Sequence, residues 1–193
     1  MAIKTFTGGD LEERAADPEA LRAAIAQCRR DLAIARQRVK APDAGKDWPG
    51  IEAREVGRLA DLLRLDGQRA ESEALFVEAI GLWAGLGKAR AGALARLRLA
   101  QVCRADGRCD EARAHLDALF EAMVDDENLN IYKDFVLYHR GVTAWRAGRQ
   151  ESAIEDLSAA LAIRAAEASK LTATTEEALR IVRAGPPATP EEP

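Results

Sequence analysis

Apolar residues recur at intervals of three and four along most of the chain, which is the spacing of one buried face of an α-helix. The first clear segment predicts a helix over 18–40, because Asp17 is a good N-cap and Pro18 occupies the first helical position. Two prolines and two glycines then break the pattern and predict a loop over 41–50. The residues before the helix are expected to form a short leader, in which Asp10 is suited to cap a single helical turn.

From residue 51 onward the pattern repeats. Gly67, Gly107 and Gly148 each follow a helical segment and lie 40 and 41 residues apart. Glycine readily takes the left-handed conformation that ends a helix. Each glycine is followed five residues later by a small residue and nine residues later by a large apolar one: Ser72 and Phe76, Ala112 and Leu116, and Ala153 and Leu157. A fixed period of this length predicts helical hairpins that stack on one another.

The repeats and the turn signals together predict the organisation of the chain. The expected segments are a leader, capping helix and loop over 1–50, three hairpins over 51–87, 88–128 and 129–168, a capping helix over 169–185 and a disordered tail over 186–193. Thr174 and Glu177 form a capping-box pattern near the start of the last helix. Gly185 and the two prolines that follow it are expected to end that helix.

The repeated residues resemble the tetratricopeptide repeat. Beside the turn glycines, the first helix of each hairpin has a small residue near its middle, at Ala60, Ala100 and Gly141. The resemblance covers 51–168, with a period of about 40 residues that is typical of the longer variants found in kinesin light chains and some bacterial regulators. It implies an all-α fold, namely an α-α superhelix of three hairpins with capping helices at both ends, and a role in protein binding.

The composition agrees with an all-helical chain. Hydrophobic residues make up 48% of the 193 residues, aromatic residues only 5%, and strong helix formers such as alanine and leucine are abundant. The net charge of −4 gives no general attraction to nucleic acid or to anionic membranes. No secretory signal and no window of about 18 apolar residues is visible, so we expect a cytoplasmic protein with no membrane span. The three cysteines are expected to be free thiols, and the frequent alanine and arginine suggest a bacterial source.

The charges are distributed unevenly between the two helices of each hairpin. Basic residues outnumber acidic ones in the first helices, and acidic residues dominate the second helices. The resemblance implies that the first helices line a concave groove, which would therefore be basic and favour an acidic partner. The positions that it assigns to partner binding are Arg58, Asp61, Arg64, Arg98, Gln101, Arg104, Tyr138, His139, Trp145 and Arg146. The alternative interpretation is that the arginines pair with acids of neighbouring repeats, which would leave the groove neutral.

These patterns favour an adaptor that binds an acidic or C-terminal segment of a partner protein in the basic groove. The alternative is a self-associating assembly factor or regulatory subunit that dimerises through helical faces, for example around Val136 and Trp145. Nucleic-acid binding is disfavoured by the charge and the few aromatic residues. We expect no enzyme, cofactor or metal site, because neither His115 nor His139 has a second ligand at metal-binding spacing.

Overall fold

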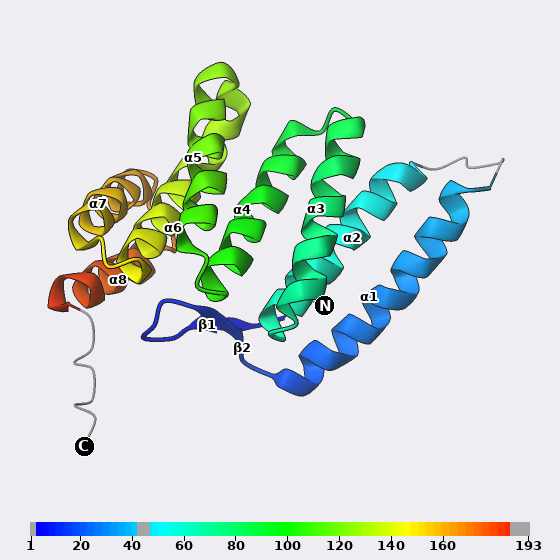
Figure 1. Ribbon diagram of the computed structural model, residues 1–193, viewed down its shortest axis with the longest axis horizontal. Coiled ribbons are helices and arrows are strands. Elements are labelled where there is room, and N and C mark those ends of the chain that lie inside the picture. Colours follow the sequence, from blue (N-terminus) through cyan, green and yellow to red (C-terminus); the bar gives the residue numbers. More distant parts are fainter. Residues whose placement is uncertain (1–2, 42–46, 186–193) are drawn as a thin grey trace. The chain divides into compact units, whose positions relative to one another are not determined.

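The computed structural model describes residues 3–41 and 47–185, and most of these residues are helical. The chain begins with two short antiparallel strands, β1 (Thr5–Thr7) and β2 (Glu13–Ala15), which form a hairpin. The helices that follow are α1 (Pro18–Val39), α2 (Trp48–Leu65), α3 (Arg69–Gly85), α4 (Ala89–Ala105), α5 (Cys109–Asp125), the 3₁₀ helix η1 (Glu127–Tyr132), α6 (Lys133–Arg146), α7 (Gln150–Ala166) and α8 (Thr172–Ala184) (Figure 1).

The chain divides into two compact units, one ending at Asp106 and the other beginning at Gly107. In the first unit, α1 packs on α2, α2 on α3 and α3 on α4, and β2 contacts α2. In the second unit, α5 packs on α6, α6 on α7 and α7 on α8. Successive packing of neighbouring helices buries their apolar faces, as the periodicity predicts. The boundary falls at the turn of the second predicted hairpin, so α4 belongs to one unit and α5 to the other.

The three predicted turn glycines end helices as expected. Gly67, Gly107 and Gly148 have φ angles of 78°, 79° and 76°, in the left-handed region that other residues rarely adopt. At the last turn, the Arg149 N–H donates to the Ala144 carbonyl over 2.8 Å and so satisfies a carbonyl at the helix end. The glycine pattern therefore located all three turns correctly.

The small residues of the repeat lie where helices approach closely. Ala60, Ala112 and Ala153 are completely buried. At Gly141 on α6 an added Cβ would lie 2.7 Å from Leu157 Cγ and 3.0 Å from the Ala153 carbonyl oxygen, so α7 packs directly against the α6 backbone at this point. The cores are then filled by large side chains from the predicted apolar positions.

The N-terminal residues and the loop differ from the prediction. Residues 4–16 form the β-hairpin instead of a featureless leader, and the Asp10 carboxylate binds the Arg14 guanidinium instead of capping a helix. Helix α2 begins within the predicted loop, because the Asp47 carboxylate caps it by accepting a hydrogen bond from the Gly50 N–H over 3.1 Å. Part of that loop, 42–46, and the predicted tail, 186–193, lie outside the described residues.

The last helix also starts differently. Helix α8 begins at Thr172, and no side chain caps its first turn, so the predicted capping box does not form. Glu177 instead binds Arg180 one turn later, with Nε donating to Oε2 over 2.7 Å. Gly185 follows the helix with a φ of 86° and confirms the predicted end. Within the described part of the chain, no helix is both long and apolar enough to span a bilayer.

Candidate functional site

The predicted binding residues of the first unit lie on α2 and α4. Three of them form a charged cluster that joins the two helices. Arg64 Nε lies 2.9 Å from Asp61 Oδ1, and Arg98 Nε lies 3.6 Å from the same oxygen. Arg98 also donates a hydrogen bond to the Gln101 side chain over 3.2 Å. The spacing of three residues within each helix places these side chains on one face, so the sequence pattern could anticipate the cluster.

The N-terminal hairpin places two consecutive carboxylates on these arginines. Glu13 Oε2 accepts hydrogen bonds from Arg64 Nη2 at 2.8 Å and from Arg98 Nη1 at 3.3 Å. Glu12 binds Arg104 through two parallel contacts, Nε to Oε1 at 2.9 Å and Nη2 to Oε2 at 3.0 Å. Such a two-point contact matches the planar fork of the guanidinium. The arginines therefore pair within the chain, with acids of the hairpin and, for Arg98, also with Asp61 of the neighbouring repeat.

Ion pairing keeps Glu13, Asp61 and Arg64 charged despite their burial. The side chains of Arg64 and Arg104 are only 6% and 2% exposed. Burial alone would raise the pKa of Glu13 and of Asp61, but the charges of Arg64 and Arg98 outweigh it, and both pKa values lie below their ordinary range. Burial likewise opposes the charge of Arg64, yet Asp61 and Glu13 raise its pKa overall. Glu13, Asp61 and Arg64 are consequently charged at neutral pH.

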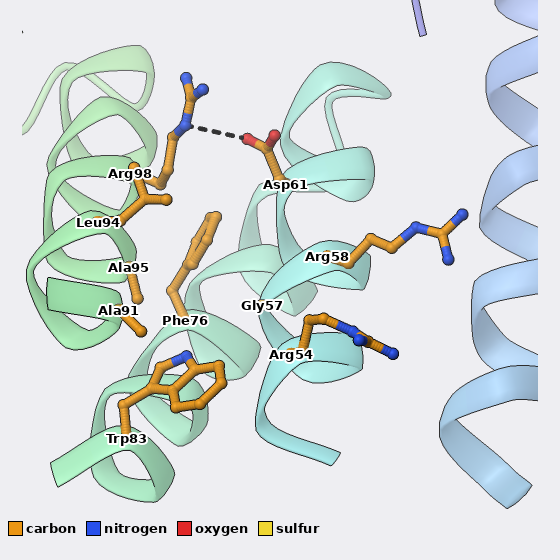
Figure 2. A pocket seen from close by; sticks show the side chains of 10 residues that line it. All are labelled: Arg54, Gly57, Arg58, Asp61, Phe76, Trp83, Ala91, Leu94, Ala95 and Arg98. Atoms are coloured by element: carbon orange, nitrogen blue, oxygen red, sulfur yellow. Dashed lines mark ion pairs between the residues drawn. The ribbon is translucent and has the colours of Figure 1, made fainter. Parts of the chain in front are cut away.

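A pocket of about 260 Å³ lies beside this cluster, between α2, α3 and α4. Its lining residues are Arg54, Gly57, Arg58, Asp61, Phe76, Trp83, Ala91, Leu94, Ala95 and Arg98 (Figure 2). Figure 2 shows the rings of Phe76 and Trp83, from α3, between the two flanking helices. Small residues create the space, since Gly57 on α2 has no side chain and α4 contributes alanines. Leu94, at 41% exposure, adds apolar surface at the edge.

The residues that line this pocket include some of the predicted binding residues and others that the sequence did not point to. Asp61, Arg98 and Arg58, which belong to the predicted binding residues, line the pocket. Phe76 and Trp83 belong to a second helix of the repeat, where packing was the expected role. The available signal was the coincidence of Gly57 with Ala91 and Ala95, whose small side chains leave space beside the aromatic rings.

Arg58 lines the pocket, but its charge is directed elsewhere. Its Nη1 lies 3.2 Å from Glu55 Oε2 and 3.7 Å from Asp31 Oδ2 on α1. Figure 2 shows the guanidinium extending away from the aromatic rings and toward α1. Glu55 is buried and also binds Arg54, with Nη2 3.0 Å from Oε1. Arg58 therefore helps to hold α1 on α2, which its position on the first helix did not reveal.

The remaining four predicted residues lie on α6 in the second unit. Tyr138 is only 7% exposed, and its ring lies 4.8 Å from the buried Arg164 guanidinium, which also binds Asp134. His139 packs edge-on against Tyr138 at 5.2 Å and is half-buried. Trp145 is half-buried and Arg146 is exposed. Tyr138, one of the predicted partner-binding residues, is thus packed in the interior, because α6 turns this face toward α7.

The expected dimerisation surface around Val136 requires a correction as well. Val136 is completely buried within the second unit and cannot contact another molecule without unfolding. Trp145, the other residue that this hypothesis named, is half-buried.

No protein-family model matches the sequence, and no curated protein matches it either. Two solved structures are similar to the fold. BtubC (BKLC) from P. vanneervenii superimposes with a TM-score of 0.55 at 16% identity, over 90% of this chain and 96% of that one. A candidate kinesin light chain from Podospora anserina, described by its nearly identical TPR-like repeats, gives a TM-score of 0.51 at 16% identity, over 88% and 96% of the two chains.

The fold is a tetratricopeptide-like helical repeat. The predicted resemblance is therefore confirmed, including the likeness to kinesin light chain repeats. At 16% identity these two structures establish the fold alone, and the binding residues rest on the geometry of this chain.

Proposed function

We propose that this tetratricopeptide-like chain is a protein-interaction module that binds an acidic segment of a partner on the face formed by α2, α3 and α4. The observation that carries the proposal is the apolar pocket beside Arg64, Arg98 and Arg104, a row of arginines that already hold carboxylates. Repeat proteins of this kind present extended surfaces for binding, and the three arginines of this face lie on the first helices α2 and α4.

The chemistry of the face fits a peptide segment better than a small molecule. A pocket of about 260 Å³ is smaller than the roughly 300–1,000 Å³ typical of small-molecule sites, and is suited to one or two apolar side chains. The arginine forks recognise carboxylates by geometry as well as by charge. A partner segment with adjacent acidic residues and one large apolar residue would use both features.

The proposal is tested with synthetic peptides that carry two adjacent glutamates beside a leucine or phenylalanine. Binding is measured by fluorescence anisotropy and compared with peptides in which glutamine replaces both glutamates. We expect the acidic peptides to bind and the glutamine peptides to lose at least tenfold in affinity. If no acidic peptide binds the wild-type chain or a variant with a neutralised hairpin, this function is wrong.

A variant that fills the pocket locates the binding site. Gly57→Leu places a side chain in the pocket without a severe clash, since a Cβ at Gly57 would meet only Ala79 Cβ, at 3.8 Å. We expect this variant to bind the acidic peptides at least tenfold more weakly while it melts at nearly the wild-type temperature. The matched control is Gly81→Leu on α3, where an added Cβ meets no atom within 4 Å. Equal affinity in Gly57→Leu and Gly81→Leu would place binding elsewhere.

A further inference from the structure

We propose that the hairpin of residues 4–16 is a resident ligand of the α2–α4 face, and that an acidic partner segment binds by displacing it. The inference rests on the proposed function, because it names the competitor at the same site. Glu12 and Glu13 occupy Arg64, Arg98 and Arg104, the guanidinium groups that a foreign carboxylate would use.

The hairpin is held mainly by its charges. All three residues of β1 are exposed, and Phe6 is 52% exposed, so this strand buries little apolar surface. Leu11 is the buried apolar residue of the hairpin, but it has a φ of 60°, a conformation that a residue with a side chain adopts at a cost. The ion pairs of Glu12 and Glu13 are therefore the main specific attachment of the hairpin to the helices.

The hairpin can leave without unwinding the helix that follows it. Ala16 alone separates β2 from Asp17, and the Ala16 N–H bonds the Lys4 carbonyl within the hairpin. Asp17 has extended backbone angles and caps α1 by accepting from the N–H groups of Glu19 and Ala20, both at 3.0 Å. Because α1 carries its own cap, rotation around Ala16 and Asp17 frees the hairpin at little cost to α1.

When the hairpin leaves, the arginines that held Glu12 and Glu13 favour the binding of another pair of carboxylates. Guanidinium groups are protonated at any physiological pH, so buried ones still favour carboxylate partners when Glu12 and Glu13 leave. Asp61 remains beside Arg64, but the contacts made by the two glutamates must be replaced. A segment with two adjacent carboxylates restores them, which makes the exchange nearly balanced in charge.

Contacts in the neighbouring pocket allow a partner segment to compete with the tethered hairpin. A tethered hairpin acts at an effective concentration in the millimolar range, so a foreign segment must add contacts to compete. No residue of the hairpin lines the pocket, whose apolar floor stays available while the hairpin is bound. Arg98 belongs to both features, since it lines the pocket and binds Glu13. A partner that fills the pocket and engages Arg98 thereby weakens the hold on the hairpin.

The test supplies the hairpin sequence in trans, as a fluorescent peptide of residues 4–16, to the full chain. In the variant Glu12→Gln/Glu13→Gln the resident hairpin loses its charges but keeps its size. We expect this variant to bind the peptide at least tenfold more tightly than the wild-type chain. Its matched control, Glu151→Gln/Glu176→Gln, removes two exposed carboxylates of the second unit and should bind like the wild type. A peptide with both glutamates changed to glutamine should not bind.

Equal affinity of the peptide for the wild type and Glu12→Gln/Glu13→Gln would overturn the proposal, and so would an absence of binding to both. The helical circular dichroism signal verifies that each variant is folded. If the double variant does not fold, the single variant Glu13→Gln takes its place in the test. A different result would support the proposed function while it contradicts competition by the hairpin. If the acidic peptides with an apolar residue bind both chains equally, the module binds acidic segments but the hairpin does not compete.

Discussion

At the scale of single residues, the size of the side chain decides where helices meet. Gly141 allows α7 to approach the α6 backbone, whereas Gly81 on α3 faces open space. The sequence could identify Gly141, because it occupies the small position that recurs in every repeat. It could not pair individual charges, since the partners of Arg98 and Arg104 lie 85 and 92 residues away in the chain.

These two glycines predict opposite effects of the same substitution. Gly141→Ala should lower the free energy of unfolding by about 1–3 kcal/mol, because its Cβ would overlap Leu157 and the Ala153 carbonyl. Gly81→Ala should raise it by about 0.5–1 kcal/mol, because alanine loses less entropy in an exposed helix. Urea unfolding followed by circular dichroism measures both. A Gly141→Ala chain as stable as the wild type would contradict the close approach of α6 and α7.

At the scale of elements, the helices were predictable and the hairpin was not. Helices with repeated apolar faces and glycine ends are local features, so their bounds follow from periodicity to within a few residues. The hairpin strands are three residues long, which is too short for a recognisable apolar alternation. A two-stranded sheet of this size is marginal by itself, so its stability depends on the helices that hold Glu12 and Glu13. That dependence is tertiary and leaves no signal in the local sequence.

The turn of the hairpin predicts a measurable acid titration. Hydrogen bonds from Arg14 lower the pKa of Asp10 from 3.8 to about 2, an effect that burial opposes. A lowered pKa means that this contact stabilises the fold fully above pH 3.8 and loses its contribution as the pH falls through about 2. An NMR titration of the Asp10 carboxyl carbon should show the lowered midpoint, and Arg14→Gln should return it toward 3.8. An ordinary midpoint in the wild type would show that the two side chains do not pair in solution.

At the scale of the whole molecule, the ten predicted binding residues divide between the two units. Six lie on α2 and α4, where Asp61, Arg64 and Arg98 converge, and four lie on α6, where Tyr138 is packed inside. The family pattern assigned partner-binding positions to α2 and α4, and in the first unit three of these positions form a charged cluster. It could not foresee that another part of the same chain binds the cluster, because a repeat motif describes only the repeats.

The central claim is that one face of the first unit holds either its own hairpin or an acidic partner segment. Hydrogen–deuterium exchange of the wild-type chain, saturated with an acidic peptide that has an apolar residue, tests it most directly. The hairpin amides between Gly8 and Ala16 should exchange faster on binding, because a displaced two-stranded hairpin loses its structure, while α2 and α4 should exchange no faster. If the peptide saturates the chain and the hairpin amides keep their protection, the two ligands do not share a site and the account is wrong.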